Sequence, residues 1–267
     1  MISVVIPTLG NFNINNLKHQ ILNNTEKVKF EIIFCIPKKK YSKLIKFLKF
    51  KNIKIVKSNV HNQVHQRLNA IKYAKFDYIL QLDDDIILDK LFLTRIYYSS
   101  KVLGRDFCLS PIFKDIFSKK IIYKKHNFFN KLTYKTLFQI DIDKKYGKLT
   151  NFGLAMDFNP NLLNIQKVDW LPGGCMLTKK AFYKNLKPDI FKNYEKSYYE
   201  DVYFSILGKY KKYIDYRIPA YLYNLKQKEN FFKDLKYLIY TYKVLNNKNF
   251  LKFITFIVYK CLKKILK

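Results

Sequence analysis

The sequence predicts an α/β protein with a mostly parallel sheet, and two features of the chain indicate it. Short apolar runs recur along the first half and alternate with amphipathic or polar segments. Strands and helices that alternate at this spacing form βαβ units, whose strands run parallel. The chain is long enough for one large domain with a proper core, since 49% of its 267 residues are apolar and 17% are aromatic.

Four apolar runs predict the first four strands. The run at 2–7 is continuous, β-branched and stopped by Pro7, which is typical of a strand buried on both faces. The other strands are expected at 30–37, 53–56 and 77–82, and the helices between and after them at 14–24, 41–50, 61–74 and 89–104. Asn62 is the candidate N-cap of the third helix.

The second half of the chain is less regular. Strand-like pieces occur at 108–113, 120–123 and 153–156. Order returns at 168–182, where a strand meets a Pro-Gly-Gly turn, and at 197–210, which reads as a helix with Glu200 and Asp201 in its first turn. We expect one continuous domain followed by a C-terminal appendage.

The charge of the chain favours an anionic partner. Lys and Arg number 51 against 20 Asp and Glu, a formal net charge of +31. The excess is nearly all Lys and accompanies abundant Asn, Ile, Phe and Tyr, residues that are frequent in proteins from AT-rich genomes. Part of the positive charge can therefore come from genome composition, which disfavours a nucleic-acid partner. Four Cys without ligand spacing argue against a zinc site or a disulfide framework. No signal peptide or membrane span is visible, which favours a cytoplasmic protein.

Three adjacent carboxylates follow the fourth strand, in the run ILQLDDD. In parallel sheets, ligands bind beyond the carboxyl ends of the strands. Hard cations such as Mn²⁺ or Mg²⁺ prefer carboxylate oxygens and are completed by substrate phosphates. Asp83 and Asp85 therefore predict a metal and nucleotide site. The alternative is that the aspartates only end the strand or cap the next helix.

Four segments together resemble family 2 of the glycosyltransferases. They are ISVVIPT, FDYILQLDDD, VDWLPGGCML and YYEDVYFSI, in that order, over roughly residues 1–225. This family transfers sugars from nucleotide-diphospho-sugars and has the GT-A fold. The resemblance implies a Rossmann-like, mostly parallel sheet flanked by helices, with a nucleotide-sugar-binding half at 1–104 and an acceptor-binding half at 105–225. A basic, amphipathic helical C-terminal segment, 226–267, would follow.

The resemblance also implies roles for single residues. On the donor side, Pro7 and Thr8 would hold the nucleotide base, and Arg67 would lie near the donor. Asp83 and Asp84 would contact the nucleotide. Asp85, with Asp83 beside it, would bind Mn²⁺ or Mg²⁺. On the acceptor side, Gly173 and Gly174 would form the turn at the sugar and acceptor, Trp170 would stack on a sugar, Asp201 would be the catalytic base and Glu200 would contact the acceptor. A core position for Trp170 is the alternative.

The chain departs from the family pattern at several points. After the second strand it reads IPKKK where acidic base contacts are usual, and Asn224 stands where a His often follows the last strand. A QxxRW signature is missing, which disfavours a processive synthase. His61 and His65 have helical i, i+4 spacing, but no third ligand accompanies them in the sequence.

The expected function is therefore metal-dependent, inverting transfer of one sugar to a glycan or lipid-linked acceptor. The expected setting is the cytoplasmic assembly of a bacterial surface polysaccharide. The segment at 249–267 combines apolar residues with lysines, so we expect either contact with an anionic membrane surface, peripheral on the inner face of the cell membrane, or packing on the domain. The alternatives for function are an Mg²⁺-dependent nucleotidyltransferase on a related sheet and a basic nucleic-acid-binding protein.

Overall fold

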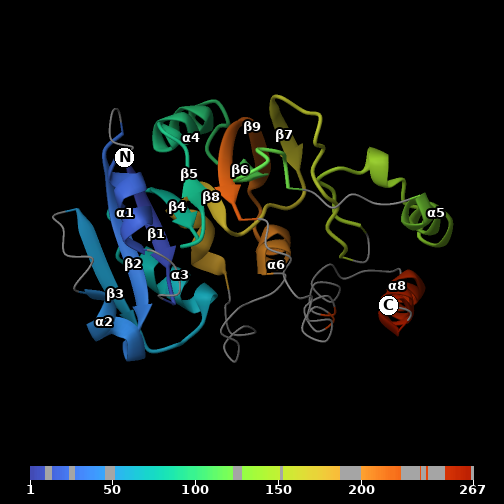
Figure 1. The fold of residues 1–267 in the computed structure, drawn as a ribbon, viewed down its shortest axis with the longest axis horizontal. Helices are drawn as coiled ribbons and strands as arrows, with labels where there is room; N and C mark the ends of the chain where they lie inside the picture. The colour runs from blue at the N-terminus through green and yellow to red at the C-terminus, as the bar shows by residue number, and fades with distance from the viewer. Residues whose placement is uncertain are drawn as a thin grey trace.

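Strands and helices alternate along the chain and build one mixed sheet flanked by helices (Figure 1). The computed structural model describes residues 1–9, 14–23, 28–45, 52–122, 128–150, 153–186, 200–223 and 250–265, with residues 235 and 239. Within these residues the sheet has nine strands in the order β3-β2-β1-β4-β8-β6-β9-β5, and β7 pairs with β9. The predicted α/β class is confirmed.

The first four strands are parallel neighbours, as the sequence predicts. They are β1 (Ile2–Pro7), β2 (Phe30–Pro37), β3 (Ile53–Ser58) and β4 (Tyr78–Leu82). Alternate residues of each strand face opposite sides of the sheet. One core contains Val4, Phe34 and Leu80, and the other contains Val5 and Ile33. Both faces are therefore apolar, which explains why these strands appear as continuous apolar runs.

Helices connect and cover these strands. They are α1 (Ile14–Leu22), the 3₁₀ turn η1 (Lys38–Lys40), α2 (Tyr41–Ile45), α3 (Gln63–Lys72) and α4 (Phe92–Lys101). Asn62 caps α3, since its side chain accepts the His65 N–H at 3.0 Å. The helix α4 starts later than predicted, after Leu91 in a left-handed conformation. Residues 46–50 of the second predicted helix lie outside the described residues.

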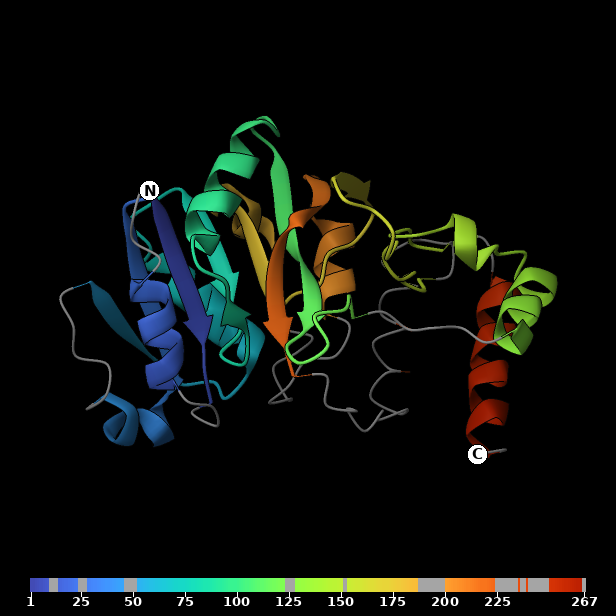
Figure 2. The ribbon, with the colours of Figure 1, turned by 45° about the horizontal axis from the view of Figure 1, so that its top comes forward.

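The second half of the sheet is mixed, whereas the sequence predicts a mostly parallel one. Its strands are β5 (Ile87–Leu88), β6 (Phe107–Asp115), β7 (Ile165–Val168), β8 (Cys175–Lys179) and β9 (Lys211–Leu222). Strand β8 runs antiparallel to β4 and β6, while β6 and β9 are parallel. The arrowheads of β1, β6 and β9 therefore reach the same edge (Figure 2). The 3₁₀ helix η3 (Lys180–Asn185) and helix α6 (Glu200–Leu207) complete this half.

The antiparallel direction of β8 positions the site. Leu82, the last residue of β4, pairs with Cys175, the first residue of β8. The Pro-Gly-Gly turn before Cys175 consequently lies beside the aspartates after Leu82. The Asp83 N–H donates to the Gly174 carbonyl at 2.7 Å, which fixes this junction.

A third apolar cluster lies apart from the sheet. Helix α5 (Phe128–Leu137), the turn η2 (Ile142–Lys144) and helix α8 (Phe250–Ile265) surround it. Figures 1 and 2 both show α5 and α8 together at the end of the molecule away from α1 and α2. The predicted C-terminal helix thus forms over Phe250–Ile265 and packs on α5, and the boundary between 225 and 226 stays a prediction.

None of the described helices is long and apolar enough to cross a membrane. The four cysteines are free, and three of them, Cys35, Cys108 and Cys175, are buried.

Candidate active site

The loops after β1 and β4 are joined at the carboxyl edge of the sheet. Thr8 follows β1 and donates its hydroxyl to the Asp84 carboxylate. The buried Gln66 of α3 donates its side-chain amide to the carbonyls of Thr8 and Cys35, at 3.0 and 2.7 Å. The ends of β1, β2 and β4 are therefore held together at the place where the sequence predicts the nucleotide. Pro7 is the buried last residue of β1.

The IPKKK segment after β2 contributes to the same edge. Lys38–Lys40 form the turn η1, and the Lys40 ammonium donates to the Leu9 carbonyl at 2.5 Å. Lys40 follows β2, at the position where the family pattern has acidic residues, and it supports the loop after β1.

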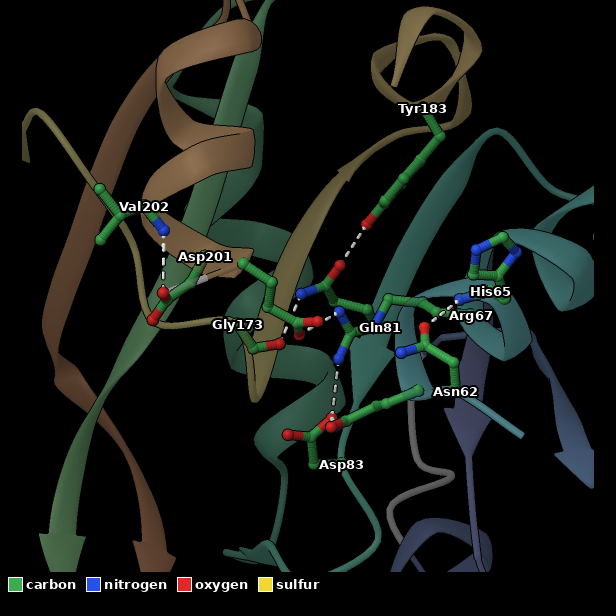
Figure 3. Close-up of polar contacts among 11 residues, drawn as sticks. Asn62, His65, Arg67, Gln81, Asp83, Gly173, Tyr183, Asp201 and Val202 are labelled. Atoms are coloured by element: carbon green, nitrogen blue, oxygen red, sulfur yellow. Dashed lines mark hydrogen bonds and ion pairs between the residues drawn. The ribbon is translucent and has the colours of Figure 1, made fainter. Parts of the chain in front are cut away.

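Arg67 joins the two acidic parts of the site (Figure 3). Its guanidinium donates from Nη2 to Asp83 at 2.9 Å and from Nη1 to Glu200 at 2.8 Å. The side chains of Arg67 and Glu200 are 3% and 8% exposed, and that of Asp83 is 21% exposed. Gln63 adds a hydrogen bond to the same Asp83 oxygen at 2.7 Å. One buried cation therefore connects Asp83, which follows β4, with Glu200 at the start of α6.

Helix α6 presents Glu200 and Asp201 in its first turn, as predicted. Asp201 accepts the Val202 N–H at 2.8 Å, which orients its carboxylate at the helix start (Figure 3). Glu200 Oε2 and Arg67 Nε are buried and have no hydrogen-bond partner among the described residues. Buried polar atoms are nearly always paired, so these two atoms indicate a place that a ligand or water would complete.

The Pro-Gly-Gly turn passes between the two carboxylate groups. A side-chain carbon on Gly173 would lie 3.3 Å from Glu200 Oε1 and from Asp201 Cβ. One on Gly174 would lie 3.4 Å from Asp83 Oδ2 and 3.1 Å from Ile86. Glycine at both positions lets the backbone approach each acid closely.

A buried glutamine on the neighbouring strand β4 holds this turn in place. Gln81 of β4 donates to the Gly173 carbonyl at 2.5 Å and accepts the Tyr183 hydroxyl at 2.9 Å (Figure 3). Arg67, Gln81, Tyr183, Glu200 and Asp201 line a cavity of about 20 Å³, which is room for one water. The sequence prediction missed Gln81 and Tyr183, and the signal for Gln81 is one amide inside an otherwise apolar strand.

Burial and neighbouring charges shift the pKa values of the site. Burial raises the pKa of Asp83 to about 7, with smaller contributions from Glu200 and Asp85, although Arg67 and Gln63 act the other way. Burial likewise raises the pKa of Asp201 to about 6, against the hydrogen bonds from Val202 and Gly173. Burial opposes the charge of Arg67, but the carboxylates of Glu200 and Asp83 more than offset it, so its pKa is raised.

The carboxylates of Asp83 and Asp85 suit a divalent cation that takes most of its ligands from a bound substrate. Asp83 and Asp85 are half-buried and close enough for the charge of Asp85 to act on Asp83. Within the described residues, no group of three or more His, Cys, Asp or Glu side chains could hold a metal. Mg²⁺ and Mn²⁺ need only one or two carboxylates when substrate phosphates supply the other ligands, so the donor set fits.

Trp170 lies beside the turn and packs against protein. Its indole stacks on Phe158, with ring centroids 4.7 Å apart, and its N–H donates to the Met156 carbonyl at 2.9 Å. Trp170 is nevertheless half-buried, and its contact with a sugar stays a prediction.

Comparison with known proteins decides the fold. No protein-family model matches the chain, and no curated protein matches it in sequence. Solved structures do match, among them TarS 1–349 of S. aureus in complex with UDP-GlcNAc, with a TM-score of 0.57, 16% identity and 92% of this chain covered. Another is GalNAc-T7 with UDP, GalNAc and Mn²⁺, with a TM-score of 0.65, 15% identity and 91% of this chain covered. Both are GT-A glycosyltransferases.

The chain has the GT-A fold. It spans 67% of the TarS fragment and 47% of the GalNAc-T7 chain. The GT-A fold that the four sequence segments predict is thereby confirmed, and at these identities the likeness concerns the fold.

Proposed function

We propose that this GT-A protein transfers one sugar from a nucleoside-diphosphate-sugar to a hydroxyl of a glycan or lipid-linked acceptor, with inversion and with a divalent cation. The observation that carries the proposal is the arrangement of two acidic groups about one glycine turn. Asp83 and the catalytic-base candidate Asp201 flank Gly173 and Gly174, and Arg67 ties Asp83 to Glu200. In such a site, one acidic group can act at the leaving diphosphate and the other at the attacking acceptor hydroxyl.

The donor half would bind the nucleotide at the edge formed by β1 and β4. Pro7 and Thr8 would lie against the base, and Asp84, fixed by the Thr8 hydroxyl, would lie near the ribose. Asp85 and the second oxygen of Asp83 would hold Mn²⁺ or Mg²⁺. When bound, such a cation neutralises charge on the diphosphate. The proposal gains support from GalNAc-T7, a GT-A neighbour whose structure contains UDP and Mn²⁺.

Asp201 is the proposed general base. Inverting transfer requires removal of the acceptor hydroxyl proton as that oxygen attacks the anomeric carbon from the face opposite the leaving group. A pKa raised to about 6 leaves Asp201 ionised at neutral pH and makes it a stronger base than an ordinary Asp. The Val202 N–H holds one carboxylate oxygen in place.

Glu200 would bind the acceptor beside this base. Its Oε1 is occupied by Arg67, and its Oε2 has no partner among the described residues, so it can accept a hydrogen bond from an acceptor hydroxyl. The acceptor would approach past Trp170 and the glycine turn. The proposed setting is the synthesis of a bacterial surface polysaccharide on the cytoplasmic side of the membrane.

A donor panel tests the proposal. We would incubate the protein with several nucleotide-sugars and Mn²⁺ and measure release of nucleoside diphosphate. Asp201→Asn should lower transfer to an acceptor by about 10²- to 10⁴-fold and keep nucleoside-diphosphate binding. Asp77→Asn, which changes an exposed carboxylate paired with Lys179, is the matched control and should keep full activity.

Two outcomes would refute the proposal. One is that the protein turns over none of the nucleotide-sugars but releases pyrophosphate from a nucleoside triphosphate, which would make it a nucleotidyltransferase. The other is that Asp201→Asn loses nucleotide binding and keeps transfer.

A further inference from the structure

Helix α8 carries an apolar stripe that the described part of the protein leaves exposed. The stripe consists of Leu251, Ile254, Val258 and Leu262, which are 82%, 40%, 49% and 52% exposed, with Phe250 beside it at 60%. Residues three and four apart lie on one face of a helix, so these side chains form a continuous row. Single exposed apolar residues are ordinary, but a row of this kind marks an interaction surface.

The opposite face of α8 fixes the orientation of this stripe. Phe253 and Phe256 are 4% and 0% exposed and pack with Tyr134 and Phe138 of the α5 region. The rings of Phe138 and Phe256 meet edge to face at 5.6 Å. Because this cluster holds the opposite face of α8, the stripe faces away from α5 and is exposed in the described part of the chain.

Charge distinguishes between occupants of the stripe. The residues at 128–150 and 250–265 contain nine Lys and two Asp, a net charge of +7, and the whole chain has +31. A second copy of this chain would bring two such surfaces together against their repulsion. A surface of anionic lipid would instead attract the lysines while it takes up the apolar row.

We propose that the α8 stripe docks the protein onto an anionic lipid surface. The helix has 16 residues and would lie flat in the headgroup region over about 24 Å, with Leu251, Ile254, Val258 and Leu262 inserted. The surface is separate from the sugar-transfer site and goes beyond the proposed transfer reaction. It would keep the enzyme where lipid-linked acceptors are found.

Vesicle co-sedimentation tests this surface in the full chain. The probes are vesicles of phosphatidylcholine alone and of phosphatidylcholine with phosphatidylglycerol. The wild type should sediment with the anionic vesicles and dissociate as salt rises from about 0.05 to about 0.5 M. The triple variant Leu251→Ser, Val258→Ser and Leu262→Ser should bind them at least about ten-fold more weakly.

A control triple variant removes exposed apolar residues elsewhere. Val102, Phe117 and Leu163 are 75%, 79% and 80% exposed and lie outside α5 and α8. Their replacement by serine should leave vesicle binding unchanged. Both triple variants should melt at the wild-type temperature and keep any transfer to a soluble acceptor, so the test does not depend on the proposed reaction.

Several results would overturn the proposal. The α8 triple variant could bind anionic vesicles as well as the wild type, or the wild type could bind neutral vesicles equally well. A melting temperature lowered only in the α8 variant would show that the stripe is packed within the protein. A dimer abolished by the α8 variant, without vesicle binding by the wild type, would make a second copy the occupant.

Discussion

Replacing Arg67 by methionine removes the cation that joins both acidic parts of the site. The side chain is 3% exposed and pairs with Asp83 and Glu200 at 2.9 and 2.8 Å. Methionine keeps the apolar stem, but it leaves two carboxylates near each other without their partner. Removal of one member of a buried ion pair typically costs about 3–5 kcal/mol. We expect Arg67→Met to lower the free energy of unfolding by that amount at neutral pH.

Urea unfolding with linear extrapolation measures this loss. Arg95→Met is the matched control, because Arg95 pairs with Asp89 at 3.2 Å while the two side chains are 47% and 39% exposed, far more than those of the Arg67 pairs. An exposed pair is worth about 0–1 kcal/mol, so the control should lose no more than that. Equal losses in the two variants would refute the view that Arg67 holds the site together.

The pH dependence of the Arg67→Met loss gives a second check. Arg67 lowers the pKa of Asp83, whose value is about 7 in the intact protein. Without Arg67, Asp83 stays protonated to higher pH in the folded state. The free energy of unfolding of the variant therefore falls more steeply than that of the wild type as pH rises. The gap between variant and wild type should therefore widen from about pH 5 to about pH 8. A gap that narrows over this range would contradict the assignment.

Two further variants test the base and the turn. The pKa of Asp201 is about 6 in the folded protein against 3.8 for the ordinary side chain, so wild-type stability should fall as pH rises from about 4 to about 6. Asp201→Asn should lack this fall and be more stable than the wild type at pH 7 by about 3 kcal/mol in urea unfolding; an unchanged pH profile would contradict it. Gln81→Leu should cost about 2–5 kcal/mol, since it strands the Gly173 carbonyl and the Tyr183 hydroxyl. Adding Tyr183→Phe should recover about 1 kcal/mol, and a further loss instead would show that Gln81 is not their shared partner.

Local patterns account for what the sequence could predict. The first four strands follow from apolar runs because both of their faces are buried, and the N-cap at Asn62 follows from its side-chain chemistry. The three aspartates could be assigned to the ligand-binding edge because they follow a strand in a βαβ pattern.

Long-range pairing accounts for what the sequence missed. The direction of β8 depends on its neighbours β4 and β6 and has no local signal. The Arg67–Glu200 ion pair joins residues 133 positions apart, and nothing in either segment indicates the other. The sequence predicts that this helix begins at residue 89, yet the left-handed conformation of Leu91 delays the start of α4 to Phe92.

Calorimetric titration of nucleoside diphosphates tests the central claim most directly. A panel titrated with and without Mn²⁺ should find one diphosphate that binds the wild type in a Mn²⁺-dependent manner. Asp85→Asn should weaken that binding by at least about ten-fold, because it removes the proposed metal ligand at the strand edge, while Asp201→Asn should bind as the wild type does. We place the donor site at Asp83–Asp85 and the base across the glycine turn. Nucleoside-diphosphate binding that depends neither on Mn²⁺ nor on Asp85, or that is lost in Asp201→Asn, would contradict this arrangement.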